Sequence, residues 1–226
     1  MTDTARNASS LPPRLPYLSR ILKAAASRRG NDTEYSIVAL SYRGFWTSKG
    51  RPSQPGIELD GEAALNWVFS QNDLQNTKIV VWGQSIGAGA ATVSLSNFVR
   101  ADYSRLQHIS GLLLETPFVD LRHMLVAMYP QKFLPYHYLA PFLRSTWDSK
   151  TALQEIGQTT PTGLKILILE AGSDEIVPAG QASILEHVCK EGAMTVDRRV
   201  VSRALHTEVM MKSQGRNFIV QFLQSI

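Results

Sequence analysis

Short aliphatic runs alternate along the chain with longer stretches in which apolar residues recur every three or four positions. The first pattern is typical of buried strands and the second of amphipathic helices. The predicted strands are 35–42 (YSIVALSY), 78–83 (KIVVWG), 111–115 (GLLLE), 165–172 (KILILEAG) and 194–201 (MTVDRRVV). The predicted helices are 58–72, 86 to about 100, 179–190 and 208–226. Strands joined by helices pair in parallel, so the pattern predicts an α/β sheet covered on both faces.

The composition argues against several classes of protein. The 226 residues suit one domain, and 44% hydrophobic with 19% charged residues is ordinary for a globular chain. The net charge of +4 is scattered, with Arg28-Arg29 and Arg198-Arg199 as the densest basic pairs, so we expect no nucleic-acid binding. The one cysteine, Cys189, excludes an internal disulfide and is expected to pack as a small hydrophobe rather than to react.

No apolar stretch approaches the roughly 20 residues that span a bilayer. The first residues, MTDTARNASS, lack the apolar region of a signal peptide. The chain as written is therefore expected to be soluble, intracellular and cytoplasmic, with no transmembrane segment. No His–Glu or cysteine pair has the spacing of metal ligands, so we expect neither a metal nor another cofactor. Nothing in the sequence indicates an oligomeric state.

The motif Gly83-Gln84-Ser85-Ile86-Gly87 falls where a predicted strand gives way to a predicted helix. A nucleophilic serine needs such a position, because a sharp turn there projects its hydroxyl beyond the end of the strand. Gly83 and Gly87 fit the turn if side chains at either position would collide as helix and strand approach. The turn also directs the N–H of Ile86 toward the space above Ser85, as half of an oxyanion hole.

Two other interpretations of this motif are a flexible joint and a phosphate-binding loop. Gly87-Ala88-Gly89, with Asp102 downstream, faintly resembles a dinucleotide-binding fingerprint. The context argues against it, because those glycines already lie inside the predicted helix and no P-loop lysine follows.

A serine hydroxyl needs a base to remove its proton and an acid to orient that base. His206 follows the last predicted strand, at the carboxyl end where functional residues gather in open α/β sheets. Asp174 follows the preceding strand, which completes the order Ser85, Asp174, His206 of an α/β-hydrolase. Glu175 and Asp120 are fallback acids. The remaining histidines are expected to be structural: His108, His123, His137 and His187.

Five landmarks follow one another along the chain: SYRGFWTSKGRPSQPGIELDGEAALNWV, VVWGQSIGAGAA, ETPFVDLRHM, GSDEIVP and ALHTE. In this order they resemble the eukaryotic bud-emergence-type (BEM family) serine hydrolases, over nearly everything from about residue 7 onward. The resemblance implies an α/β-hydrolase fold, with a mostly parallel sheet flanked by helices. By matched position it implies nucleophile Ser85, acid Asp174 and base His206. The family often has H-N-D or H-G-D where this chain has His206-Thr207-Glu208.

The start of the chain departs more from the family, whose members have earlier strands and then an H-G-N loop. Here Ala5-Arg6 stands where His-Gly would be, and no preceding residues form those strands. The N-terminal strands are therefore expected to be missing, which suggests a truncated or mispredicted gene product with exposed strand edges. Asn7 matches the position whose N–H completes the oxyanion hole, and losing such a donor typically lowers kcat by about 10²–10³-fold. Activity is accordingly expected to be weak or absent if Asn7 is not held in place.

The segment 116–147 is irregular, aromatic and interrupted by prolines. It is expected to form a helical and aromatic cap, about 116–150, within a single partial domain of 1–226. It is interpreted either as a cap packed on the body of the domain or as a cover whose inner face binds an acyl chain above Ser85. The two interpretations are compatible.

The sequence thus predicts a serine hydrolase that cleaves carboxylic esters or thioesters of lipid or acyl-protein type. Its partner would be a small-molecule or lipid acyl substrate, or an acylated protein. The alternative is a catalytically silent α/β-hydrolase-like interaction protein without a complete oxyanion hole. Dehalogenase or peroxidase chemistry is disfavoured, since a dehalogenase usually has an aspartate where this chain has Ser85. Members of the family are commonly associated with the endoplasmic reticulum or plasma membrane through N-terminal segments absent from this chain.

Overall fold

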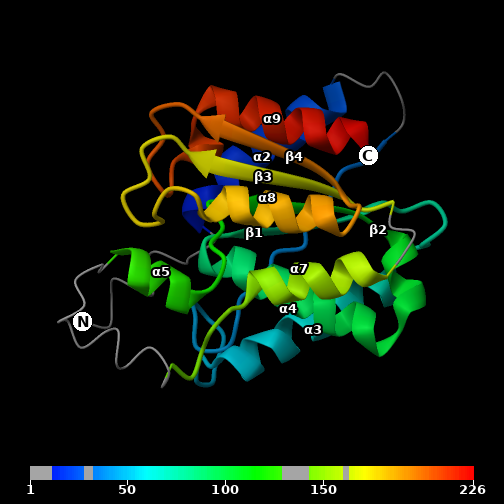
Figure 1. Cartoon of the computed structure of the whole chain (residues 1–226). Coiled ribbons are helices and arrows are strands. Elements are labelled where there is room, and N and C mark those ends of the chain that lie inside the picture. Colours follow the sequence, from blue (N-terminus) through cyan, green and yellow to red (C-terminus); the bar gives the residue numbers. More distant parts are fainter. Residues whose placement is uncertain (1–11, 28–32, 129–142, 160–162) are drawn as a thin grey trace.

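Parallel strands form the centre of the computed structural model, which describes residues 12–27, 33–128, 143–159 and 163–226. The described strands pair in chain order, β1 to β4 (Figure 1). Their bounds are β1 Ile79–Gln84, β2 Ile109–Glu115, β3 Lys165–Ala171 and β4 Thr195–Val201. Parallel strands end at the same edge of a sheet, so the loops that follow all of them open at one side of the molecule.

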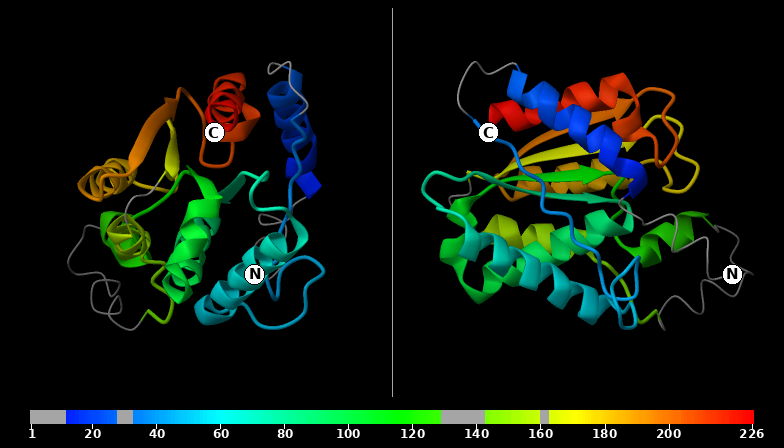
Figure 2. Two further views of the ribbon diagram at one scale, coloured as in Figure 1. Left: turned by 90° about the vertical axis from the view of Figure 1, so that its right-hand side faces the viewer. Right: turned by 180° about the vertical axis from the view of Figure 1, so that it is seen from behind.

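Helices cover both faces of this sheet, as the end-on view in Figure 2 shows. One face carries α4 (Ile86–Ala101), α7 (Ser149–Gln158) and α8 (Gln181–Glu191), and α3 (Gln54–Gln71) packs on α4. The other face carries α2 (Leu15–Ser27) and α9 (Ser213–Ser225). Successive side chains of β2 point to opposite faces of the sheet, so this strand contributes to the hydrophobic core on each face. Leu112 and Leu114 face the first helical layer, and Leu113 faces the second. The α/β prediction is confirmed.

Four of the five predicted strands are confirmed, but the strand predicted at 35–42 is wrong. That segment has no regular secondary structure, and its aliphatic side chains Ile37, Val38 and Leu40 are 39%, 53% and 40% exposed. A strand needs a neighbour to pair its N–H and C=O groups. Among the described residues β1 pairs only with β2, so no strand lies between β1 and this segment to complete a ladder.

Helix α2 was not predicted, and three prolines lie at or just before its start. The one that falls within the helix, Pro16, lies in the first turn, where a missing N–H costs nothing. Its buried residues Leu18, Ile21 and Ala25 recur at helical spacing, which is the signal that could have identified the helix.

Other boundaries shift for local reasons. Helix α3 begins at Gln54 rather than at residue 58, because the Ser53 hydroxyl accepts the Gly56 N–H as an N-cap. The predicted closing helix is divided into a short 3₁₀ turn, Val209–Met211, and α9. Lys212 between them is extended, with φ −76° and ψ 144°. Helix α7 was not predicted, and 3₁₀ turns Pro12–Arg14 and Tyr103–His108 precede α2 and β2.

Only parts of the predicted cap can be compared with the structure. Helix α5 (Leu121–Met128) and residues 143–150 are described, whereas 129–142 lie outside the described residues. Phe118 and Trp147 are 2% exposed and belong to one buried cluster with Val177, so the two described ends of the cap segment pack on the domain body. Assignment of the whole segment as a cap, like the single domain over 1–226, stays a prediction.

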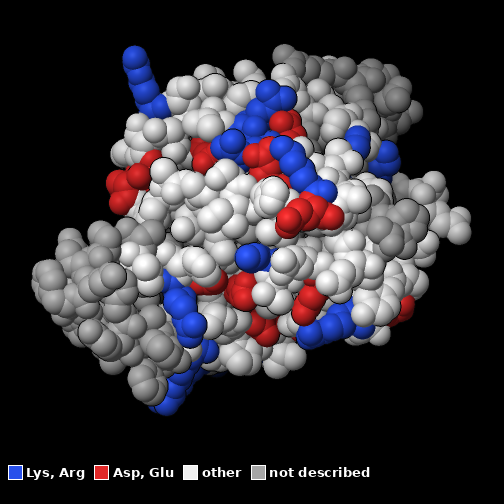
Figure 3. All heavy atoms as spheres, viewed as in Figure 1, with Lys and Arg blue, Asp and Glu red and all other residues white. Residues whose placement is uncertain are grey.

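Basic and acidic side chains alternate on the face seen in Figure 3. Arg198 lies 2.5 Å from Glu186 and also pairs with Glu170. Arg199 lies 2.8 Å from Asp197, and its guanidinium covers the ring of Phe218. Both arginines of this pair are therefore matched by carboxylates.

Candidate active site

Ser85 lies on a strained turn between β1 and α4. Its backbone has φ 53° and ψ −121°, which is rare for any residue with a side chain. Hydrogen bonds on both sides hold that conformation, because the Ser85 N–H donates to the Glu115 carbonyl at 2.9 Å and its own carbonyl accepts the Ala88 N–H at 2.8 Å. Strain that is held in this way is typical of functional positions.

The predicted steric role of the flanking glycines holds for one of them. A Cβ at Gly83 would meet the carbonyl group of Gly87 and would lie 2.6 Å from Cα of Ala88, so only glycine fits there. A Cβ at Gly87 would have no described atom within 4 Å, so the collision expected at that position is wrong. The close approach is instead at Gly89, where a Cβ would lie 3.0 Å from Cβ of Trp147.

His206 and Asp174 come together at the carboxyl edge of the sheet, from the loops after β4 and β3. Nδ1 of His206 lies 3.0 Å from both carboxylate oxygens of Asp174. Their side chains are 5% and 12% exposed, so the pair is largely shielded from water. The amides of Ile176 and Val177 donate to the same Asp174 oxygen at 2.9 and 2.8 Å, which fixes the carboxylate within its own turn.

Two opposing effects act on the pKa of Asp174. Burial is the largest and would raise this pKa, but hydrogen bonds from His206 and from the amides of Val177 and Ile176 together outweigh it. The net pKa lies below its ordinary value, so this carboxylate is ionised at neutral pH and can stabilise a positively charged imidazole.

The main chain of His206 is held from two sides. Its N–H donates to Oε2 of Glu175 at 2.9 Å, and its carbonyl accepts from Nε2 of Gln84 at 3.4 Å. Since Gln84 directly precedes Ser85, the second contact joins the histidine loop to the serine turn. The Ser85 hydroxyl itself makes no hydrogen bond to any residue that the structure describes. Hydrogen bonds between catalytic groups are often long before substrate binds.

The fallback acids and the other histidines either contact different groups or lie outside the described residues. Asp120, a fallback acid, pairs with His123 on α5 rather than with His206. Glu175, the other, contacts the main chain of His206 instead of its ring. His187 pairs with Glu191 on the surface of α8, and His108 lies edge-on to the Phe69 ring. His137 and Asn7 lie outside the described residues.

Ile86 is the first residue of α4, and an amide at that position has no acceptor within its own helix. Its N–H is thus available at the serine turn. Cys189 is fully buried in the core, so the prediction that it packs as a small hydrophobe is confirmed, and burial raises the pKa of its thiol to about 12.

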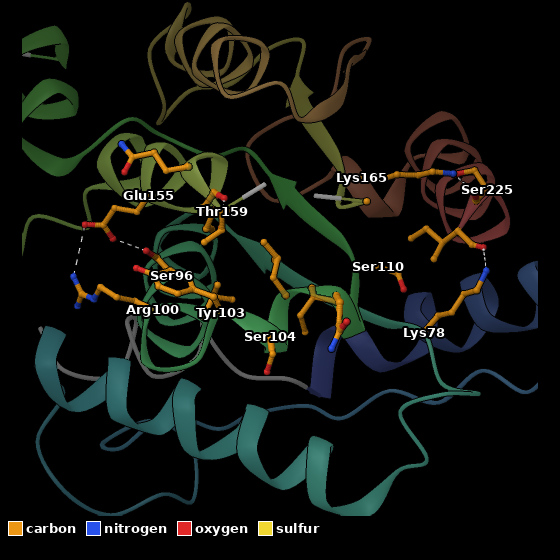
Figure 4. A pocket seen from close by; sticks show the side chains of 18 residues that line it. Lys78, Ser96, Arg100, Tyr103, Ser104, Ser110, Glu155, Thr159, Lys165 and Ser225 are labelled. Atoms are coloured by element: carbon orange, nitrogen blue, oxygen red, sulfur yellow. Dashed lines mark hydrogen bonds and ion pairs between the residues drawn. The ribbon is translucent and has the colours of Figure 1, made fainter. Parts of the chain in front are cut away.

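A cavity of about 1230 Å³ lies away from the candidate site. Figure 4 shows it at the amino ends of the strands, where Lys78 directly precedes β1 and Lys165 is the first residue of β3. Both lysines donate to main-chain carbonyls at the end of α9, those of Ile226 and Ser225. Neither Ser85, Asp174 nor His206 lines this cavity. Within the described ranges, no three His, Cys, Asp or Glu side chains gather as metal ligands would.

Several curated proteins are similar to this chain, although no family model matches it. Protein bem46 of Schizosaccharomyces pombe is 30% identical over 183 residues, which is 81% of this chain and 54% of that protein. The alpha/beta hydrolase domain-containing protein WAV2 of Arabidopsis thaliana is 31% identical over 153 residues, covering 63% and 45%. Lysophosphatidylserine lipase ABHD12 of Gallus gallus is 27% identical over 183 residues, covering 77% and 45%. The chain spans about half the length of the curated relatives it matches.

Solved structures agree on the fold. An esterase/lipase from an uncultured bacterium superposes with a TM-score of 0.65 at 16% identity, covering 96% of this chain and 72% of that one. A Pyrococcus furiosus esterase gives 0.62 at 18% identity, covering 93% and 74%. The parallel sheet, its two helical layers and the serine turn after β1 define an α/β-hydrolase fold. The chain belongs to the bud-emergence-type family of α/β-hydrolase proteins, together with bem46, WAV2 and ABHD12. In the described part of the chain, no helix is long and apolar enough to cross a bilayer.

Proposed function

We propose that this chain is a serine hydrolase that cleaves carboxylic esters or thioesters, with Ser85, His206 and Asp174 as its triad. The observation that carries the proposal is the meeting of a strained serine turn with a buried His206–Asp174 pair, through the contact of Gln84 with the His206 carbonyl. Relatives that share the family and esterases that share the fold support the same assignment.

In the first half of the reaction, Oγ of Ser85 attacks the acyl carbon while Nε2 of His206 takes the hydroxyl proton. The Asp174 carboxylate, close to Nδ1, keeps the imidazole in the tautomer that leaves Nε2 free and stabilises the resulting imidazolium. The proton then passes to the leaving alcohol or thiol as the acyl bond breaks. An acyl group remains on Ser85.

In the second half, water replaces the leaving group and His206 again acts as the base. The water oxygen bonds to the acyl carbon, the Ser85 oxygen leaves with the proton held by His206, and a carboxylic acid is released. The negative oxygen of each tetrahedral intermediate needs nearby donors. The Ile86 N–H is one, and the N–H of Asn7 is proposed as the second.

Apolar side chains adjoin each member of the triad. Ile86 follows Ser85 and is 52% exposed, Ile176 is 41% exposed two residues after Asp174, and Leu205 precedes His206 and is 44% exposed. Large apolar side chains exposed beside a reactive centre favour an apolar ligand. We therefore assign lipid-like acyl substrates, or acylated proteins, to this site. The name of the relative ABHD12, a lysophosphatidylserine lipase, points the same way.

Hydrolysis of a series of 4-nitrophenyl esters and acyl thioesters tests the function. Ser85→Ala should lower kcat/KM at least about 10⁴-fold, as loss of a triad nucleophile does. The matched control is Ser183→Ala on the exposed surface of α8, which should stay within about twofold. Equal activity in wild type and Ser85→Ala would rule out Ser85 as the nucleophile.

A catalytically silent interaction protein is the second candidate. The observation that favours it is the Ser85 hydroxyl, which has no hydrogen-bond partner among the described residues. Folded wild-type protein that hydrolyses none of these esters or thioesters would support this alternative over the enzyme.

A further inference from the structure

Glu115 is a buried carboxylate that the proposed reaction does not use. It is the last residue of β2, has 0% exposure and lies in register with Gln84 at the end of β1. Its main-chain carbonyl accepts the Ser85 N–H. Its Oε1 accepts from Nη2 of Arg14 at 2.8 Å and from Nε1 of Trp82 at 2.6 Å. The main chain of Glu115 therefore contacts the base of the serine turn, while its side chain contacts Arg14 and Trp82.

Arg14 connects this carboxylate to the serine turn. While Nη2 bonds Glu115, Nη1 donates to Oε1 of Gln84 at 2.5 Å. Nε and Nη2 also lie 3.1 and 2.9 Å from Sδ of Met210, in the 3₁₀ turn that follows His206. The planar fork of a guanidinium can hold several partners at fixed angles, which the single ammonium of a lysine cannot do. Arg14 thus contacts the ends of β1 and β2 and the chain after β4.

The side-chain amide of Gln84 contacts both Arg14 and His206. A guanidinium only donates hydrogen bonds, so it must face the oxygen of the Gln84 amide. The amide nitrogen then points the other way, toward the His206 carbonyl at 3.4 Å. One continuous series of contacts runs from Glu115 through Arg14 and Gln84 to His206.

We propose that Arg14, Glu115 and Gln84 form a positioning network that sets the separation of the Ser85 hydroxyl and the His206 imidazole. The inference rests on the proposed function, and none of the three is a catalytic residue. A buried ion pair is often no more stabilising than apolar residues of similar size, so stability alone does not account for it. Burial raises the pKa of Glu115, although the charge of Arg14 and the bonds from Trp82 and Arg14 oppose this, so the carboxylate depends on its partners.

Two substitutions separate this role from general stability. Arg14→Lys keeps a positive charge beside Glu115 but cannot hold Gln84 at the same time. Gln84→Leu removes the contacts of the Gln84 amide with Arg14 and with His206 but leaves the Arg14–Glu115 ion pair intact. It therefore tests the positioning network even if Arg14→Lys does not fold. The matched control is Arg43→Lys, which loses a bidentate pair of similar geometry, 2.7–3.0 Å from Asp60, without a hydrogen bond to any of Ser85, Gln84 or His206.

Steady-state kinetics give the first readout. Arg14→Lys and Gln84→Leu should lower kcat about 10²-fold with KM changed less than about threefold, since misplaced reacting groups mainly affect the chemical step. Arg43→Lys should leave kcat unchanged. Unchanged kcat in folded Arg14→Lys and Gln84→Leu enzyme overturns the inference.

Hydrogen–deuterium exchange gives a readout that needs no turnover. Peptides covering 84–88 and 204–208 should exchange about tenfold faster in both network variants, because a charged hydrogen bond is lost. The same peptides should be unaffected in Arg43→Lys. If wild type is inactive, the proposed function fails while exchange still decides the positioning role. Equal exchange in wild type and both variants overturns the network.

Discussion

The described structure contains two close His–Asp pairs, both through Nδ1 of the histidine, that differ in sequence separation, burial and surroundings. His206 and Asp174 are 32 positions apart, nearly buried, and fixed by the amides of the aspartate turn. Asp120 directly precedes α5, His123 lies three positions later in its first turn, and the His123 side chain is 60% exposed. Asp120 also accepts the His123 N–H at 2.7 Å, as a helix cap does. The comparison shows that a short His–carboxylate distance does not by itself mark a catalytic pair.

The surroundings of each pair account for the difference. Residues three apart on a helix are neighbours whatever the fold, so local spacing alone produces the pair on α5. The buried pair exists only because β3 and β4 end side by side and deliver both loops to one edge. That edge also holds the Ser85 turn, whereas among the described residues the His123 ring has its polar contact with Asp120.

Removing each imidazole should give the largest contrast. His206→Ala should lower kcat/KM for ester hydrolysis at least about 10⁴-fold, because the proposed base is lost. His123→Ala should remain within about twofold, as surface substitutions do. Both are measured with the same 4-nitrophenyl ester after far-UV circular dichroism shows folded protein. A comparable loss in His123→Ala would mean that the α5 pair takes part in the reaction.

Removing each carboxylate charge comes next in size. Asp174→Asn should lower kcat about 10⁴-fold, because an amide facing Nδ1 favours the wrong imidazole tautomer. Asp120→Asn keeps an equally good helix cap and should change neither kcat nor thermal stability measurably. If Asp174→Asn retained most of its kcat while Asp120→Asn lost it, the assignment of the acid would have to be reversed.

Acid titration of stability should separate Asp174 from its asparagine variant. The folded pKa of Asp174 is lowered, so its ionised form stabilises the fold above the unfolded pKa of about 3.9, and this contribution is lost as pH falls through the folded pKa. Urea unfolding should therefore show wild type more stable than Asp174→Asn at pH 7, with a difference that shrinks in acid. A difference that grows on acidification would contradict the direction of that shift.

The smallest effect is expected at Glu175. Within the described ranges its carboxylate accepts one hydrogen bond, from the main-chain N–H of His206, and Glu175→Gln keeps an acceptor oxygen at the same place. We expect kcat to fall about threefold, the effect of weakening one hydrogen bond. Glu175→Gln behaving like Asp174→Asn would show that Glu175, rather than Asp174, serves the imidazole.

Much of the fold could be predicted because strand and helix periodicity is local. Strands β1 to β4 and helices α4 and α8 were close to prediction, and the positions of Ser85, Asp174 and His206 after strands led to the carboxyl edge of the sheet. The strand expected at 35–42 was wrong because a strand also needs a partner, which its own residues cannot reveal.

Features that depend on contact in space could not be read from the sequence. Gly83 and Gly87 look equivalent in the motif, yet only at Gly83 would a Cβ strike the helix backbone. The Arg14 network joins residues 70 and 101 positions apart, and no spacing rule connects them. Helix α2 was not predicted, although its buried residues Leu18, Ile21 and Ala25 recur at helical spacing.

Covalent labelling tests the central claim most directly. We predict that a fluorophosphonate adds once to folded wild-type protein, that mass spectrometry places the adduct on Ser85, and that labelling is abolished in Ser85→Ala and at least about 10³-fold slower in His206→Ala. An adduct on another residue, or folded wild-type protein that acquires none, would contradict the claim that His206 and Asp174 activate Ser85.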